Sequence, residues 1–189
     1  MRVISGNKRG LKLQTPIGDG TRPTEDRVKE NIFNILGQMF YDSKVIDLFS
    51  GTGQIGIEFL SRGAEKVIFV EREKNVLKVL KENLAKSSYK AKILEKDVLV
   101  ALDSIDGRFD YIYMDPPYDD EVLYYKVAEK IYNLNLLEED GVLVVEERTE
   151  SQHDFSEYFE PIKNKKYGST TIQFWRRRWK SYMRGVLTL

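Results

Sequence analysis

The chain has 189 residues and no cysteine, and its 30 basic residues balance its 30 acidic ones. This length suits one domain with a sizeable core, and the lack of cysteine excludes disulfides and thiolate metal sites. No apolar run approaches the roughly 18 residues of a membrane span, which predicts a soluble, cytoplasmic protein without a membrane partner. Residues 1–12 and 163–189 carry twelve basic residues and no acidic ones. These basic ends either contact nucleic acid or form solvated surfaces.

The N-terminal segment is predicted to form a small basic β-hairpin, with strands at residues 2–4 and 11–13 around the turn Gly6-Asn7-Lys8-Arg9-Gly10. A connection rich in glycine, proline and threonine follows at residues 15–23. Thr24 is then predicted to cap a helix whose apolar face repeats every three or four residues as far as Met39. Arg22 and Thr24 either line a cofactor or nucleic-acid channel, or serve only as a surface charge and a helix cap.

From Lys44 onward, short apolar strands alternate with helices. The predicted strands are residues 45–49, 66–71, 91–95, 109–114 and 141–147, and the predicted helices are residues 55–61, 74–86, 98–104 and 121–133. Apolar strands separated by helices indicate a mostly parallel sheet that is covered on both faces. Residues 158–166 and 170–176 flank the turn Gly168-Ser169 and predict an antiparallel hairpin at the sheet edge. Tyr158, Tyr167 and Trp175 are expected to pack this hairpin.

A glycine-rich loop joins the first of these strands to the helix that follows. Gly51, Gly53 and Gly56 have the spacing G-x-G-x-x-G, and Glu71 ends the next strand 20 residues after Gly51. Together they match the dinucleotide-binding fingerprint, in which glycines let the backbone approach the ligand and the acidic residue binds ribose. A nicotinamide-dependent dehydrogenase is therefore one interpretation.

Asp47 favours a different ligand for the same loop. It lies four residues before Gly51, at the strand tip, where its charge would repel a pyrophosphate and attract the sulfonium and ammonium groups of S-adenosylmethionine. With that cofactor, Glu71 would accept both ribose hydroxyls through its two oxygens. Asp97 would accept from the adenine amino group and the Val98 N–H would reach a ring nitrogen; alternatively, Asp97 is a helix N-cap.

The stretch Asp115-Pro116-Pro117-Tyr118 follows the predicted strand 109–114. The two prolines have fixed φ and no N–H, so the loop leaves the strand as a stiff extended turn with free carbonyls. Asp115 and the Pro116 carbonyl offer two acceptors for an exocyclic amine, while the Tyr118 ring can stack on the base. The same four residues could also form an ordinary turn. Because they follow a glycine-rich loop in the sequence, they predict a site for a nucleobase amine.

This combination of motifs resembles the class I S-adenosylmethionine-dependent methyltransferases that act on exocyclic amines. It comprises the run from Asp47 through Phe49 to Gly53, then Glu71, Asp97 and the 115–118 loop. More narrowly, residues 22–34 preceded by a basic hairpin resemble the RsmD-type enzymes, and the similarity extends over residues 1–176. It implies a Rossmann-like α/β domain with a mostly parallel seven-stranded sheet, an antiparallel edge hairpin and the small N-terminal basic β-hairpin. In this single methyltransferase domain, residues 1–23 precede the catalytic core 24–176, and residues 177–189 form a basic extension without an assigned role.

The resemblance also implies methyl transfer from S-adenosylmethionine to a guanine N2 amino group of small-subunit (16S) ribosomal RNA, free or within an assembling particle. The implied catalytic residues are Asp115, Pro116 and Tyr118. The implied cofactor-binding residues are Asp47, Phe49, Gly51, Gly53, Glu71, Asp97 and Val98. The candidates for RNA contact are Arg2, Lys8, Arg9, Arg22, Thr24, Arg176, Arg177 and Arg178. No metal is expected, and the lone His153 is expected at the surface.

Two other functions remain open at this stage. The same loop would serve an adenine N6 methyltransferase acting on DNA or another RNA. A catalytically inactive nucleic-acid-binding module with a Rossmann-like core is the other alternative, although the intact Asp47, Glu71 and Asp115 argue against it.

Overall fold

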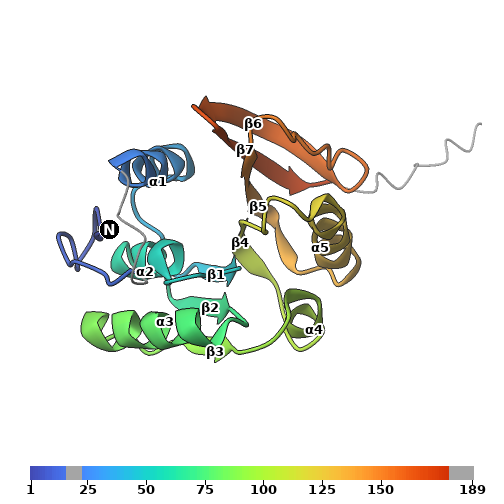
Figure 1. Ribbon diagram of the computed structural model, residues 1–189. Helices are drawn as coiled ribbons and strands as arrows, with labels where there is room; N and C mark the ends of the chain where they lie inside the picture. Colours follow the sequence, from blue (N-terminus) through green and yellow to red (C-terminus); the bar gives the residue numbers. More distant parts are fainter. Residues whose placement is uncertain (16–22, 179–189) are drawn as a thin grey trace, which may run out of the picture.

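The computed structural model describes residues 1–15 and 23–178, with the backbone alone for residues 23–25. Within this part, seven strands form one sheet in the order β3-β2-β1-β4-β5-β7-β6 (Figure 1). The strands are β1 (Lys44–Leu48), β2 (Lys66–Val70), β3 (Lys92–Leu94), β4 (Phe109–Met114), β5 (Leu137–Arg148), β6 (Phe159–Tyr167) and β7 (Thr170–Arg177). Strand β7 runs in the direction opposite to the other six strands. The predicted mostly parallel sheet with an antiparallel edge hairpin is therefore confirmed.

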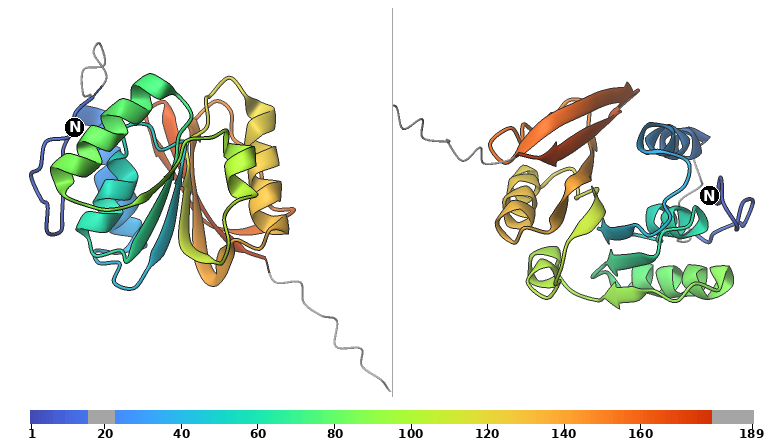
Figure 2. Two further views of the ribbon diagram at one scale, coloured as in Figure 1. Left: turned by 90° about the horizontal axis from the view of Figure 1, so that it is seen from below. Right: turned by 180° about the vertical axis from the view of Figure 1, so that it is seen from behind.

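Helices cover both faces of the sheet (Figures 1 and 2). One face packs against α1 (Pro23–Leu36), α2 (Gln54–Ser61) and α3 (Lys74–Ser87), and the other against α4 (Val98–Leu102) and α5 (Glu121–Asn133). Because side chains alternate along a strand, Val45 joins the first core and Ile46 the second, and both are fully buried. Because both faces of the sheet are buried, the strand sequences are nearly continuous runs of apolar residues. No helix in residues 1–15 and 23–178 is long and apolar enough to cross a membrane.

The register of the parallel strands brings their carboxyl ends to one edge of the sheet. Leu48 lies opposite both Val70 and Met114, and Met114 lies opposite Val145. The residues that follow β1, β2 and β4, together with the last residues of β5, therefore meet at this edge. In open α/β sheets this edge is where ligands bind.

The N-terminal segment is an integral part of the domain. Arg2 and Lys12 form a single antiparallel bridge, where the sequence predicted two three-residue strands. The backbone N–H groups of Ile4 and Ser5 donate to the buried Glu58 of α2 at 2.8 and 2.9 Å. Glu58 also pairs with two buried cations, Lys29 of α1 at 3.5 Å and Arg62 at 2.9 Å. These bonds satisfy a carboxylate that would otherwise be costly to bury.

Several predicted boundaries are wrong by a few residues. Helix α1 begins at Pro23, so Thr24 lies inside its first turn and is not its cap, and it ends before Gly37, whose φ is +131°. Met39 therefore lies outside the helix and is 47% exposed. Strand β5 begins at Leu137, four residues earlier than predicted, because an irregularity in its pairing with β4 accommodates the extra residues.

Candidate active site

The loop between β1 and α2 is shaped by its glycines. Gly53 has φ +83°, and a Cβ there would lie 2.4 Å from the Leu80 side chain; a Cβ on Gly56 would lie 2.3 Å from the Phe69 ring. These two glycines let α2 pack closely on α3 and β2. Gly51 has φ +54° and open space around its missing Cβ, so it is the glycine that leaves room for a ligand. Phe49 also has a positive φ of +57°, which is rare for a bulky side chain and typical of a constrained ligand loop.

Asp47 lies beneath this loop. It is 1% exposed, and its Oδ2 accepts from the Gly56 N–H at 2.9 Å, so its direct contact is with the loop backbone. Burial raises the pKa of Asp47 to about 7, an effect that the hydrogen bond from Gly56 partly opposes. A positive charge on the other side of the loop would favour the ionised form.

Glu71 holds the loop from the side of β2. Its Oε2 accepts from the Gly51 N–H at 2.9 Å, and its Oε1 accepts from the N–H groups of Arg72 and Glu73 at 2.8 and 2.9 Å. A carboxylate has about four acceptor sites, so these bonds leave capacity for about one more. That Glu71 accepts both ribose hydroxyls stays a prediction, and these bonds leave an acceptor site for one of the two.

Asp97 is the N-cap of α4, which is the second of the two roles predicted for it. Its Oδ1 accepts from the Leu99 N–H at 2.9 Å, and its Oδ2 pairs with Arg72 at 3.0 Å. Val98 is the first residue of α4, where a backbone N–H has no acceptor inside the helix. The predicted cofactor residues thus lie at the end of β1 and in the loop after it, just after β2, and at the start of α4, along one edge of the sheet.

The loop 115–118 leaves β4 at the same edge. Asp115 is half-buried, and burial, followed by the carboxylates of Glu146 and Asp47, holds its pKa well above the ordinary range. The Tyr124 hydroxyl lies 3.3 Å from the Pro116 carbonyl oxygen and 3.1 Å from that of Glu146. The guanidinium of Arg148 lies 5.1 Å from the centre of the Tyr118 ring, a cation–π contact. The loop 115–118, which we call the acceptor loop, therefore lies beside the glycine loop, because β4 pairs with β1.

Sequence reasoning missed Tyr124, Glu146 and Arg148. Glu146 and Arg148 end β5, a strand that was predicted, and the carboxyl ends of parallel strands meet at one edge, so their polar character was a usable signal. Tyr124 gave no such signal, because it lies on α5 and reaches the loop only through tertiary packing. Among the described residues, no group of three or more histidine, cysteine, aspartate or glutamate side chains could hold a metal ion.

Comparison with known proteins agrees with this geometry. The family described as Conserved hypothetical protein 95 matches residues 1–176. The chain belongs to this family. The protein YlbH of Bacillus subtilis is 42% identical over 77% of this chain and 82% of its own length. Ribosomal RNA small subunit methyltransferase D of Haemophilus influenzae is 33% identical over 93% of both chains. The solved structure of yhhF from Escherichia coli superposes with a TM-score of 0.83 at 26% identity, covering 94% of this chain and 98% of that one.

These relatives confirm the RsmD-type methyltransferase family that the sequence motifs indicated. The match begins at residue 1, so the family includes the N-terminal segment that docks on Glu58. It ends at residue 176, within β7.

Within this family fold, the predicted RNA-contacting residues lie on opposite sides of the domain. The N-terminal segment with Arg2, Lys8 and Arg9 and the end of β7 lie at opposite ends of the views in Figures 1 and 2. Arg176 forms an ion pair with Glu160 at 3.0 Å. It lies opposite Val142 of β5, whereas Arg148, at the end of β5 that borders the site, lies opposite Thr170. Thr170 and Arg176 are six positions apart, which corresponds to about 20 Å at about 3.4 Å per residue. Arg22 and the side chain of Thr24 lie outside the described residues.

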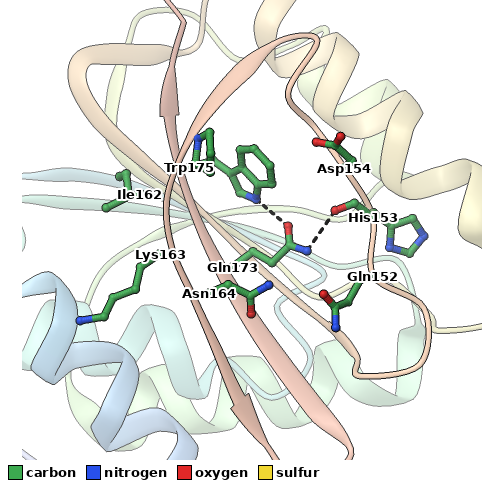
Figure 3. A pocket seen from close by; sticks show the side chains of 9 residues that line it. Gln152, His153, Asp154, Ile162, Lys163, Asn164, Gln173 and Trp175 are labelled. Atoms are coloured by element: carbon green, nitrogen blue, oxygen red, sulfur yellow. Dashed lines mark hydrogen bonds between the residues drawn. The ribbon is translucent and has the colours of Figure 1, made fainter.

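The prediction that His153 lies at the surface is wrong. Its ring is 6% exposed, stacks on Tyr124 with centroids 4.1 Å apart, and bonds through Nδ1 to the buried Glu147 at 2.8 Å. Figure 3 shows Gln173 between His153 and Trp175, accepting from the Trp175 indole at 2.7 Å and donating to the His153 carbonyl at 3.0 Å. A pocket of about 500 Å³ lies over this network. Trp175 is buried against Phe155, as expected for a residue that packs the hairpin.

Proposed function

We propose that this chain transfers a methyl group from S-adenosylmethionine to the N2 amino group of a guanine in small-subunit ribosomal RNA, in the cytoplasm. A relative of this chain is named for methylation of small-subunit ribosomal RNA. The observation that carries the proposal is the meeting, at one sheet edge, of a glycine loop over a buried carboxylate and an Asp-Pro-Pro-Tyr loop. The first suits a cationic cofactor and the second an exocyclic amine.

The donor half of the site fits S-adenosylmethionine better than a dinucleotide. Asp47 is buried under the loop with a raised pKa of about 7, a state that a nearby cation relieves and a pyrophosphate would worsen. Gly51 offers room for the ligand, Phe49 and Gly53 fix the loop, and Glu71 retains an acceptor for a ribose hydroxyl. Asp97 and Val98, at the start of α4, would meet the adenine.

When bound, S-adenosylmethionine supplies an electrophilic methyl group on a sulfonium. Asp115 and the Pro116 carbonyl accept the two N–H groups of the target amine, which favours a pyramidal nitrogen whose lone pair points at that methyl group. The Tyr118 ring stacks on the extruded base. Much of the rate then comes from orientation, and Asp115 or solvent takes the proton that the amine loses.

The basic residues at both ends would contact phosphates and set the affinity for RNA, without a direct part in the chemistry. The proposed contacts are Arg2, Lys8, Arg9, Arg22, Thr24, Arg176, Arg177 and Arg178. The N-terminal group (Arg2, Lys8 and Arg9) and the group at the end of β7 (Arg176, Arg177 and Arg178) lie on opposite sides of the domain, which fits an RNA or a ribosomal particle larger than the protein.

The test is methyl transfer from labelled S-adenosylmethionine to naked small-subunit ribosomal RNA and to assembling small-subunit particles, both from cells that lack this protein. Nucleoside analysis should then detect N2-methylguanosine. Comparison of the two substrates shows whether bound ribosomal proteins are required. N6-methyladenosine would retain the enzyme class and overturn the guanine assignment, and no incorporation into either substrate would overturn the proposed substrate class.

A further inference from the structure

Glu146 stands beside Asp115 at the site edge. In the pairing of β4 with β5, Tyr113 lies opposite Val144 and Met114 opposite Val145. Continued by one residue past the end of β4, this register brings Asp115 beside Glu146, with both side chains on the same face of the sheet. In keeping with this placement, burial and then the charge of Glu146 raise the pKa of Asp115.

Both the side chain and the main chain of Glu146 are anchored to the acceptor loop and its strand. The hydroxyl of Tyr113, a residue that is 5% exposed, donates to Glu146 Oε2. The Tyr124 hydroxyl lies within hydrogen-bonding distance of the carbonyl oxygens of both Glu146 and Pro116. Glu146 is thus held in a fixed position relative to the two acceptors proposed for the target amine.

The two acceptors of the loop cannot by themselves distinguish guanine from adenine, because both bases present an amino group with two N–H bonds. The ring nitrogen next to that amino group differs. In guanine, N1 carries a hydrogen and is a donor, whereas in adenine N1 is an acceptor with a lone pair. A second carboxylate beside the first would bond to the former and repel the latter.

We propose that Glu146 accepts the N1–H of the target guanine and thereby makes the site selective for guanine over adenine. This inference rests on the proposed function and adds the residue that determines base specificity. A carboxylate has about four acceptor sites, so the bond from Tyr113 is compatible with a second one from the base.

The test pairs a change in the protein with a change in the base. The protein change is Glu146→Gln, which keeps the side-chain size and an oxygen for Tyr113. The RNA is small-subunit ribosomal RNA ligated to carry either guanine or 2-aminopurine at the methylated position. 2-Aminopurine keeps the amino group at C2 but has a lone pair at N1 and lacks O6, so the change that Glu146→Gln makes to the preference, and not the preference alone, reports the predicted contact.

We expect the unmodified enzyme to prefer guanine over 2-aminopurine by about 100-fold or more in kcat/KM. Glu146→Gln should lower kcat/KM for guanine by about 10- to 100-fold and leave that for 2-aminopurine unchanged or higher. The matched control is Glu150→Gln, an exposed carboxylate four residues further on, which should preserve the preference. Cofactor affinity measured by calorimetry should stay within a few-fold in both variants.

The outcomes separate this inference from the proposed function. An enzyme that methylates guanine but loses activity on both bases equally upon Glu146→Gln would assign Glu146 a structural role and overturn the inference alone. An unmodified enzyme that accepts both bases equally would overturn it without any variant, which covers the case of a poorly folded Glu146→Gln. An enzyme that methylates no guanine would overturn the proposed function itself.

Discussion

The glycine loop after β1 and the acceptor loop after β4 lie at the same sheet edge but are built differently. The first is fixed by the main chain, through positive φ angles, close packing of Gly53 and Gly56, and backbone bonds to Asp47 and Glu71. The second is fixed by prolines and by side chains that reach it from β5 and α5. Substitutions in the first should therefore act mainly on folding, and substitutions in the second mainly on chemistry.

The largest effect is expected for Asp115→Ala. Loss of the acceptor for the target amine should lower kcat by at least about 100-fold, while cofactor affinity stays within a few-fold. Removal of a carboxylate close to Glu146 and Asp47 should leave stability unchanged or higher. The matched control is Asp119→Ala in the same loop, a side chain that is 95% exposed, which should keep activity within about twofold. An active Asp115→Ala enzyme would show that this carboxylate does not hold the amine.

For the glycine loop, we expect Gly53→Ala to cost about 2–4 kcal/mol of unfolding free energy. Its Cβ would meet Leu80 at 2.4 Å in addition to the strain of φ +83°. Gly107→Ala is the matched control, because Gly107 has φ +92° but nothing within 4 Å of the added Cβ. It should cost only about 1–2 kcal/mol. Equal costs in urea unfolding would show that the close packing is unimportant.

Asp47→Asn should change the pH dependence of stability. In the folded chain the pKa of Asp47 is raised to about 7 from its ordinary 3.8, so the folded state binds more protons than the unfolded state between these values. Stability due to this group therefore falls as the pH rises from about 4 to 7 and is level above that range. The variant should be more stable at pH 8, by on the order of 1–3 kcal/mol, with a difference that shrinks towards pH 5. An unchanged profile in urea unfolding at several pH values would contradict this assignment.

The smallest effects should come from residues outside both loops. If about six phosphates are contacted, log affinity for RNA should fall with log salt with a slope of about −4 to −5. Replacement of Arg176, Arg177 and Arg178 by alanine, or of Arg2, Lys8 and Arg9, should each reduce that slope by about 2–3 and raise KM while kcat is unchanged. Filter binding across a salt series provides the measurement. A slope near zero for the unmodified protein would exclude the basic ends as an RNA surface.

Sequence reasoning located the elements that depend on local patterns. The strand and helix alternation, the glycine loop and the Asp115–Tyr118 loop follow from periodicity and from proline and glycine chemistry. It failed where an environment is assembled from distant segments. His153 is buried because Tyr124 from α5, Phe155 and the carboxylate of Glu147 enclose it, and none of these contacts leaves a pattern around residue 153. Glu146 differs, because a polar residue near the end of a predicted strand was a usable signal, whereas its position beside Asp115 depends on the register of β5 with β4.

The docking of the N-terminal segment on α2 and α3 also determines the order in which this chain can fold. The N–H groups of Ile4, Ser5, Lys8 and Gln14 bond to side chains that follow them by 53 to 69 residues. During synthesis, these N-terminal residues therefore wait for their partners until α3 has left the ribosome. Loss of residues 1–12 would leave the buried Glu58 without its backbone donors. Removal of residues 1–12 should thus impair folding of the whole domain, although their partners lie more than 50 residues further along the chain.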